Sequence, residues 1–385
     1  MKRLFVLLGT ALFLNFGAYA QNHENKLVIK PSGRILVDGG LFDANEQNEK
    51  FNDGFAVPDM RIGCNATYGP WKAKIDMGYS YGKVNMKDVF LQYNFGKKSH
   101  DFLRLGYFIH QFGLQSATSS SFKVSMEEPR SNQAFNNSRL IGLMYQHTHK
   151  SFMGTVSLFT ESDAMKMTSD KLGNQGVGAM TRLLYRPFRE PGKILHVGIS
   201  GAVESPRYNS DAELNHHSYV LSTTYPTRIS KVVAQKAVID DAKVLYKFTP
   251  EVTAAIGRFG LEAQYFYVNV DRKGDKSSYK ASGAYGNLRA LVKGDEYTYA
   301  NMDGGIATPK PGEMEVVLAY NYTDMSDHKA EILGGRMNDW SVTFNYYLNK
   351  YMTWRVRSSY TKTSDRAEVP NTELGIIETR LQIKF

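Results

Sequence analysis

Basic side chains recur through this 385-residue sequence in alternation with apolar ones, and they are the residues best suited to binding a ligand. The planar guanidinium of arginine can bind an oxyanion through two parallel N–H hydrogen bonds, whereas the lysine ammonium is a point charge on a flexible side chain. Several cations in series can compensate an anion for its lost hydration and still release it. The positions that alternation assigns to one polar face are Arg61, Lys72, Lys74, Arg104, Arg182, Lys243, Lys247, Arg355, Arg357, Arg380 and Lys384. The alternative role for each is a structural ion pair with a carboxylate such as Asp76, Glu262 or Glu315.

Other chemically capable residues form no recognised catalytic or cofactor site. Gly173, Gly176 and Gly178 are not followed by the Gly-Lys-Ser/Thr of a phosphate-binding loop, so they indicate a turn. His147 and His149 have no acidic or cysteine partner at metal-ligand spacing. Neither a nucleophile elbow nor an HExxH helix occurs. The sequence therefore predicts no catalytic residue, no cofactor and no metal.

The elements that would hold the basic residues are strands with a period of two. Within residues 71–79 the odd positions carry most of the apolar side chains, while Lys72 and Lys74 occupy even positions. Residues 60–68 and 314–322 show the same alternation. A soluble sandwich could also produce this pattern, because any half-buried sheet has one apolar face.

Three further features favour a membrane-spanning sheet over a soluble one. The alternating stretches approach the roughly 9–11 residues that a tilted transmembrane strand requires. Aromatic residues gather near strand ends, as in the girdles of outer-membrane barrels, for example Trp71, Tyr351 and Trp354. Charges reach deep into the strands, which only a wet lumen tolerates. The fold class expected is all-β, a transmembrane antiparallel β-barrel.

Turn signals divide the chain from Leu27 to Phe385 into about sixteen strands. Short connections such as Gly69-Pro70 contrast with long polar ones, as expected for periplasmic turns and extracellular loops. The long loops expected outside the cell are residues 116–137, 204–240 and 294–312. No linker interrupts the pattern, so residues 21–385 are predicted to form a single β-barrel domain.

The first twenty residues read as a secretory signal peptide. Lys2 and Arg3 precede an apolar run over residues 4–16, and Ala18-Tyr19-Ala20 fits a cleavage site. A short buried N-terminal helix is the alternative, since the run is too short to span a bilayer comfortably. Without Lys2 and Arg3, 45 basic and 38 acidic residues leave a net charge of +7. That balance attracts anions without choosing among them.

Several segments resemble the phosphate-selective porins O and P. Residues 103–115 read LRLGYFIHQFGLQ, and residues 118–130 carry TSS and MEEPR, similar to a strand and loop of that family. Residues 335–349 read GRMNDWSVTFNYYLN, similar to a later family motif. The final strand alternates and ends in Phe385, which resembles the assembly signal of outer-membrane barrels. Gln111 and Gln115 depart from the family pattern, which expects Pro and Glu there.

The resemblance implies a sixteen-stranded trimeric barrel in the outer membrane of a Gram-negative bacterium, surrounded by outer-membrane lipid. It also implies a basic constriction that passes small anions, in some members phosphate or polyphosphate. Lys123 and Arg130 lie in the segment that resembles the inward-folded loop, so they are the first candidates for the constriction. No nucleic-acid partner is expected.

Other functions remain open on the sequence alone. A general diffusion porin without phosphate preference would differ from a phosphate porin in its ion selectivity. An outer-membrane barrel enzyme would need a reactive Ser or Asp pair with a nearby His, and no convincing set occurs. A soluble secreted β-binding module would dissolve without detergent, whereas a barrel should migrate on a gel in a heat-dependent way.

Overall fold

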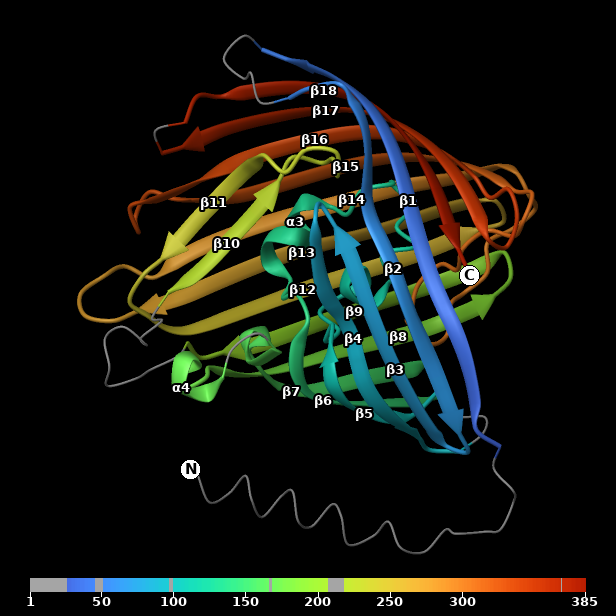
Figure 1. Ribbon diagram of the computed structural model, residues 1–385. Helices are drawn as coiled ribbons and strands as arrows, with labels where there is room; N and C mark the ends of the chain where they lie inside the picture. Colours follow the sequence, from blue (N-terminus) through green and yellow to red (C-terminus); the bar gives the residue numbers. More distant parts are fainter. Residues whose placement is uncertain (1–25, 46–50, 97–99, 166–167, 207–217, 368) are drawn as a thin grey trace, which may run out of the picture.

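The computed structural model describes residues 26–45, 51–96, 100–165, 168–206, 218–367 and 369–385 (Figure 1). The predicted signal peptide, residues 1–20, lies outside these ranges. Within them, sixteen antiparallel strands close into a barrel that runs in chain order, with β9 next to β12 and β1 next to β18. They are β1 (Val28–Ala44), β2 (Gly54–Tyr68), β3 (Trp71–Ser80), β4 (Lys83–Asn94), β5 (Phe102–Phe108), β6 (Leu140–His149), β7 (Phe152–Thr160), β8 (Val177–Glu190), β9 (Lys193–Glu204), β12 (Ala242–Ile256), β13 (Phe259–Arg272), β14 (Tyr279–Lys293), β15 (Met314–Asp327), β16 (Ile332–Tyr346), β17 (Met352–Arg366) and β18 (Thr372–Lys384).

The remaining elements are short and belong to connections between barrel strands. A two-stranded sheet, β10 (Tyr219–Thr224) with β11 (Val233–Ile239), lies between β9 and β12 in the sequence. The short helices are α2 (Leu114–Ala117), α3 (Arg130–Phe135), η2 (Ser162–Met165) and α4 (Ser169–Leu172).

Among the described residues, no helix combines the length and the hydrophobicity needed to cross a membrane.

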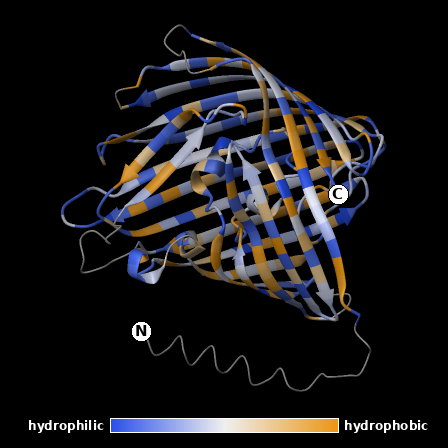
Figure 2. Ribbon diagram, viewed as in Figure 1, coloured by the Kyte–Doolittle hydropathy of each residue, from blue (hydrophilic) through white to orange (hydrophobic). Residues whose placement is uncertain are grey.

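The predicted alternation and the predicted barrel are both confirmed. Along β12, Tyr246 and Phe248 are exposed on the outside while Lys247 and Thr249 are buried inside. Figure 2 shows the same change between hydrophobic and hydrophilic residues along the barrel strands. Successive side chains of a strand point to opposite faces, so each strand gives one set to the outer wall and one to the interior. The outer wall is therefore rich in exposed apolar and aromatic side chains, as a lipid-facing surface requires.

One predicted loop lies at the other end of the barrel from where it was expected. Residues 294–313, here called the inner segment, join β14 to β15 at the same end as the short turn Gly69-Pro70. The sequence shows that this connection is long and polar. The end of the barrel at which it lies depends on how many strands precede it. The inner segment folds back into the barrel, where Tyr297 and Tyr299 are buried.

The interior is filled on one side by an apolar cluster rather than being polar throughout. Phe266, Val268 and Val270 of β13 point inward and are buried, although the outward side chains of this strand include aromatic ones. They pack with Phe112 and Phe135 from the connection between β5 and β6. This packing fixes that connection to the β12–β15 side, and a cavity lies between the connection and strands β1–β5.

Candidate functional site

The connection between β5 and β6, residues 109–139, folds into the barrel and is here called the inward loop; α3 lies near the centre of Figure 1. Its backbone is tied to the wall, because Gly113 N donates to Ser200 Oγ (3.0 Å). Ser131 Oγ donates to Asn321 Oδ1 (2.8 Å). Beneath α3 lies Gly283 of β14, where a Cβ atom would come within 2.8 Å of Ser131 Cβ and 3.0 Å of the Phe135 ring. A glycine at this position thus permits the close approach of loop and wall.

Between the inward loop and strands β1–β5 lies a cavity of about 450 Å³, here called the basic cavity. Its loop side presents hydroxyl groups from Ser116 to Ser121. Six cations and three carboxylates line it, so its formal charge is positive. The cations are Arg34, Arg61, Lys72, Lys74, Arg104 and Arg139, and the carboxylates are Asp76, Asp88 and Asp303.

Carboxylates partly neutralise the middle of the basic cavity. Asp59 is shared by Arg34 and Arg61, and the distance from Arg61 Nε to Asp59 Oδ2 is 3.0 Å. Lys74 Nζ lies 2.7 Å from Asp76 and 3.0 Å from Asp88. Sharing one carboxylate between two guanidinium groups leaves a surplus positive charge, which can attract an anion without trapping it.

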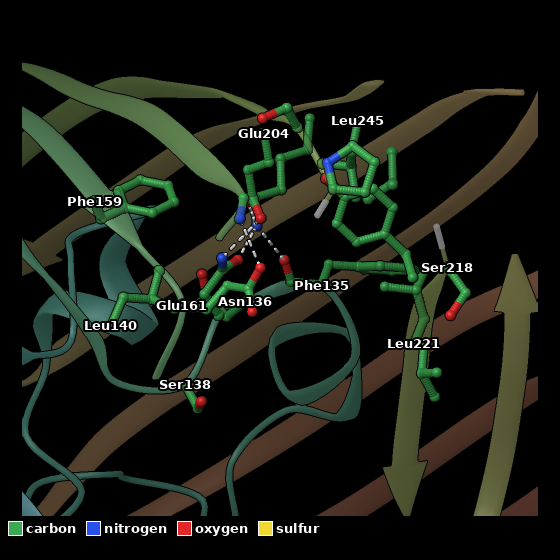
Figure 3. Close-up of a pocket in the computed structure, with 18 of the residues that line it drawn as sticks. Phe135, Asn136, Ser138, Leu140, Phe159, Glu161, Glu204, Ser218, Leu221 and Leu245 are labelled. Carbon is green, nitrogen blue, oxygen red and sulfur yellow. Dashed lines mark hydrogen bonds and ion pairs between the residues drawn. The ribbon is translucent and has the colours of Figure 1, made fainter. Parts of the chain in front are cut away.

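A second cavity, of about 560 Å³, lies on the other side of the inward loop, against β6–β10 (Figure 3). Figure 3 shows Phe135, Phe159 and Leu245 beside the carboxylate of Glu204. Glu204 Oε1 lies 2.8 Å from Lys247 Nζ and neutralises this cation. The second cavity is therefore mixed apolar and acidic, and it does not share the cationic lining of the first.

The family model for phosphate-selective porin O and P matches residues 29–385. The chain belongs to this family. The match covers nearly the whole chain and confirms the resemblance noted in the sequence. The protein is thus an outer-membrane porin of a Gram-negative bacterium, a channel rather than an enzyme. No curated protein sequence matches the porin.

Solved structures with the same barrel fold share little sequence with this porin. The trimer form of OmpT from Vibrio cholerae has a TM-score of 0.59 at 10% identity, covering 94% of this chain and 100% of that one. The anion-selective porin from Comamonas acidovorans has a TM-score of 0.59 at 12% identity, with the same coverage. The DcaP channel of Acinetobacter baumannii has a TM-score of 0.56 at 11% identity, covering 93% and 97%. At these identities the likeness shows the fold alone.

The two loop cations favoured by the sequence do not line the basic cavity of the porin. Lys123 is buried and donates to the carbonyl and side-chain oxygens of Gln115. Arg130 is buried too, and its guanidinium donates to the carbonyl of Glu128 (2.6 Å) and contacts Glu127 Oε2 (3.4 Å). Burial lowers the pKa of the Lys123 ammonium. Both side chains hold the inward loop together, so a direct role in anion binding stays a prediction for them.

Of the other predicted cations, Arg61, Lys72, Lys74 and Arg104 share the basic cavity. Lys243 is exposed at a bulge between Ala242 and Val244, outside the residues that line the cavity. The remainder are mostly buried against fixed partners inside the barrel. Their contacts are Arg182–Glu251 (2.6 Å), Lys247–Glu204 (2.8 Å), Arg357–Asp339 (3.1 Å), Arg380–Asp38 (2.5 Å), Arg355 with the Lys123 carbonyl, and Lys384 over the Phe122 ring (4.3 Å).

Four charged lining residues were missed by the sequence reasoning: Arg34, Asp88, Arg139 and Asp303. Alternation could have found Arg34, because Leu36 and Asp38 on the same face of β1 are also buried inside. Arg139 precedes β6 and Asp303 belongs to the inner segment. Because neither residue lies in a strand, alternation could not indicate that either faces the cavity.

Glu127 of the inward loop should make the loop sensitive to strong acid. Burial opposes its ionisation, but Arg380, Arg228 and Arg130 outweigh burial and lower its pKa from 4.5 to about 2. A carboxyl with a lowered pKa stabilises the fold above its ordinary pKa, and this contribution is lost as the pH falls through about 2. We expect single-channel current to become noisier as the pH is lowered from 5 toward 2 (roughly the window between the two pKa values). The Glu127→Gln variant should show a noisy single-channel current at both ends of this pH range. Equal pH dependence of the noise in variant and wild type would contradict a role for Glu127 in holding the loop.

Proposed function

We propose that this porin conducts small anions through the basic cavity, with phosphate-like oxyanions preferred, and that it assembles as a homotrimer. The surplus of six lining cations over the three lining carboxylates and the neighbouring Asp59 carries the proposal. The family description names phosphate selectivity, and a solved porin of the same fold is described as anion-selective. The trimer form of OmpT supports the homotrimer.

The test is conductance of the porin, purified from outer membranes, in planar bilayers. Reversal potentials in a salt gradient should give a preference for chloride over potassium, and millimolar phosphate should block the chloride current. Analytical ultracentrifugation in detergent should give the mass of three chains. Anion preference without phosphate block would support a general diffusion porin, and cation preference would contradict the proposal.

Arg61→Gln is the sharpest single variant, because Arg34 still neutralises Asp59 after the change. Loss of one surplus cation should lower the chloride-to-potassium permeability ratio about fivefold, since a charge acting at about 4 Å through water contributes about 1 kcal/mol. Lys243→Gln is the matched control and should leave the ratio unchanged, because Lys243 lies outside the cavity lining. Equal effects of the two variants would mean that the net charge of the protein, rather than this cavity, determines the anion selectivity.

A further inference from the structure

A groove of about 600 Å³ lies on the outer wall of the barrel, over strands β13–β17, which are neighbours in the sheet (Figure 1). Its apolar lining includes Leu288, Leu318 and Val342. The volume lies within the range of about 300–1,000 Å³ that holds a single ligand molecule. Twelve residues line the groove, whereas a stable interface with a second copy of the chain uses about 20–30 residues on each side. The groove therefore fits one narrow occupant better than a protein surface.

The groove is open because glycine interrupts a wall of large side chains. The register of the strands places Gly286, Tyr320, Trp340, Tyr360 and Gly375 in one row across β14–β18. The three aromatic rings, here called the aromatic ridge, are exposed, with ring centroids 5.4 and 6.4 Å apart. A Cβ atom added at Gly286 would meet no atom within 4 Å. The wall beside the aromatic ridge thus has room for part of another molecule.

The aromatic ridge lies just below the outer surface of the membrane. The next outward row toward the loop end contains Asn338, Lys362 and Glu373, and Lys362 Nζ lies 2.9 Å from Glu373. Charged side chains on the lipid-facing wall cost little only near the membrane surface, and aromatic girdles lie beside that surface. Neighbouring rows are two residues, about 7 Å, apart along a strand. At this depth, the acyl chains of outer-leaflet lipids join their headgroups.

One polar group of the aromatic ridge is left for an acceptor outside the protein. The hydroxyl groups of Tyr320 and Tyr360 donate to polar side chains of the next row. Trp354, another tryptophan of the outer wall, donates from Nε1 to Thr379 Oγ1 (2.9 Å). Within the described part of the chain, the Trp340 Nε1–H has no acceptor. A polar group in an apolar medium costs free energy unless it forms a hydrogen bond, so an acceptor from the membrane is favoured here.

We propose that this groove binds an ester-linked acyl chain of an outer-leaflet lipid. The chain occupies the opening beside Gly286 and packs against the apolar side chains of the groove. Its ester carbonyl accepts the hydrogen bond from Trp340 Nε1. An ester carbonyl accepts and does not donate, and it lies where the chain meets the headgroup, so it matches a single N–H at this depth. The inference is independent of the proposed function, because the groove lies outside the barrel.

Tryptophan fluorescence tests the proposal, because the chain has three tryptophans. Replacing Trp71 and Trp354 with phenylalanine leaves Trp340 as the fluorophore. This parent porin is reconstituted in vesicles of ether-linked phosphatidylcholine with a rising fraction of dibrominated phosphatidylcholine, whose bromines quench nearby tryptophan. The brominated lipid is either ester-linked or ether-linked. Half of the maximal quenching should need about fivefold less of the ester-linked lipid, the factor that a hydrogen bond of about 1 kcal/mol gives.

Gly286→Leu fills the groove without a clash, and it should remove the preference for the ester-linked lipid. Gly201→Leu is the matched control, because Gly201 of β9 lies outside the groove lining and a Cβ atom there would be 4.0 Å from the nearest atom. It should keep the parent's preference, and all variants should retain heat-modifiable migration on gels.

Equal half-quenching fractions for the two brominated lipids in the parent porin would overturn the inference. An unchanged preference in Gly286→Leu would overturn it too, because binding would not depend on the groove. If neither lipid quenches Trp340, a second copy of the chain covers this wall, and the lipid site is refuted. None of these results bears on anion conduction, which the bilayer recordings test separately.

Discussion

Replacing Arg182 with methionine is expected to lower the free energy of unfolding by about 3–5 kcal/mol, because a buried carboxylate loses its partner. Arg182 Nε and Nη2 bind both oxygens of Glu251, at 3.1 and 2.6 Å, and both side chains are fully buried. Among the described residues, His196 would be the remaining ionisable partner of Glu251, with Nε2 2.7 Å from Oε1. The same variant loses the donors to the carbonyls of Asp303 and Gly304, so the inner segment should loosen and the channel conductance should rise.

A second variant separates these two effects. In Arg182→Met with Glu251→Leu, both partners are apolar, and replacing a whole buried pair is often neutral or stabilising. Stability, measured by urea unfolding followed through tryptophan fluorescence, should therefore recover, while the raised conductance persists. A double variant that restores both stability and conductance would mean that Arg182 does not anchor the inner segment.

Replacing Arg380 with methionine is expected to cost a similar amount, about 3–5 kcal/mol, and to free the inward loop. Arg380 Nη2 lies 2.5 Å from Asp38 Oδ2 and 2.6 Å from Glu127 Oε1, and Nη1 donates to the carbonyl of Met126 (2.8 Å). Two buried carboxylates would lose their shared cation. Single-channel records should show added fluctuations, because the loop segment at Met126 and Glu127 is no longer tied to the wall.

Arg380→Lys is the matched control for charge. Lysine keeps the positive charge but lacks the planar fork that serves two carboxylates and a carbonyl together. We expect an unfolding free energy between those of wild type and Arg380→Met, with most of the fluctuations still present. A lysine variant as quiet and as stable as wild type would show that charge alone holds the loop.

The barrel could be predicted because the alternation of apolar and polar residues that defines its strands is visible in the sequence. Alternation along residues 71–79 assigns Lys72 and Lys74 to the inside without any knowledge of their neighbours. Where both faces of a strand are apolar, as around Phe266 of β13, alternation does not show which side chains face the barrel interior. That is why the apolar cluster that displaces the cavity to one side was not foreseen.

The candidate site was harder to predict, because it depends on which cations already form hydrogen bonds or ion pairs with other groups of the protein. Lys123 and Arg130 are charged loop residues by sequence, yet oxygens of the inward loop, including the carboxylates of Glu128 and Glu127, already bind them. Lys243 is displaced by a single bulge that no sequence pattern marks. Asp303 enters the site only because the inner segment folds inward, which follows from three-dimensional packing.

The seam between the first and last strands carries a consequence for how the porin matures. Asp38 of β1 and Arg380 of β18 face each other in the register that closes the barrel, and the same guanidinium reaches Glu127 of the inward loop. Strand β18 thus supplies the side chain that holds a loop some 250 residues earlier in the sequence. We therefore expect the inward loop to be fully anchored only once β18 has paired with β1.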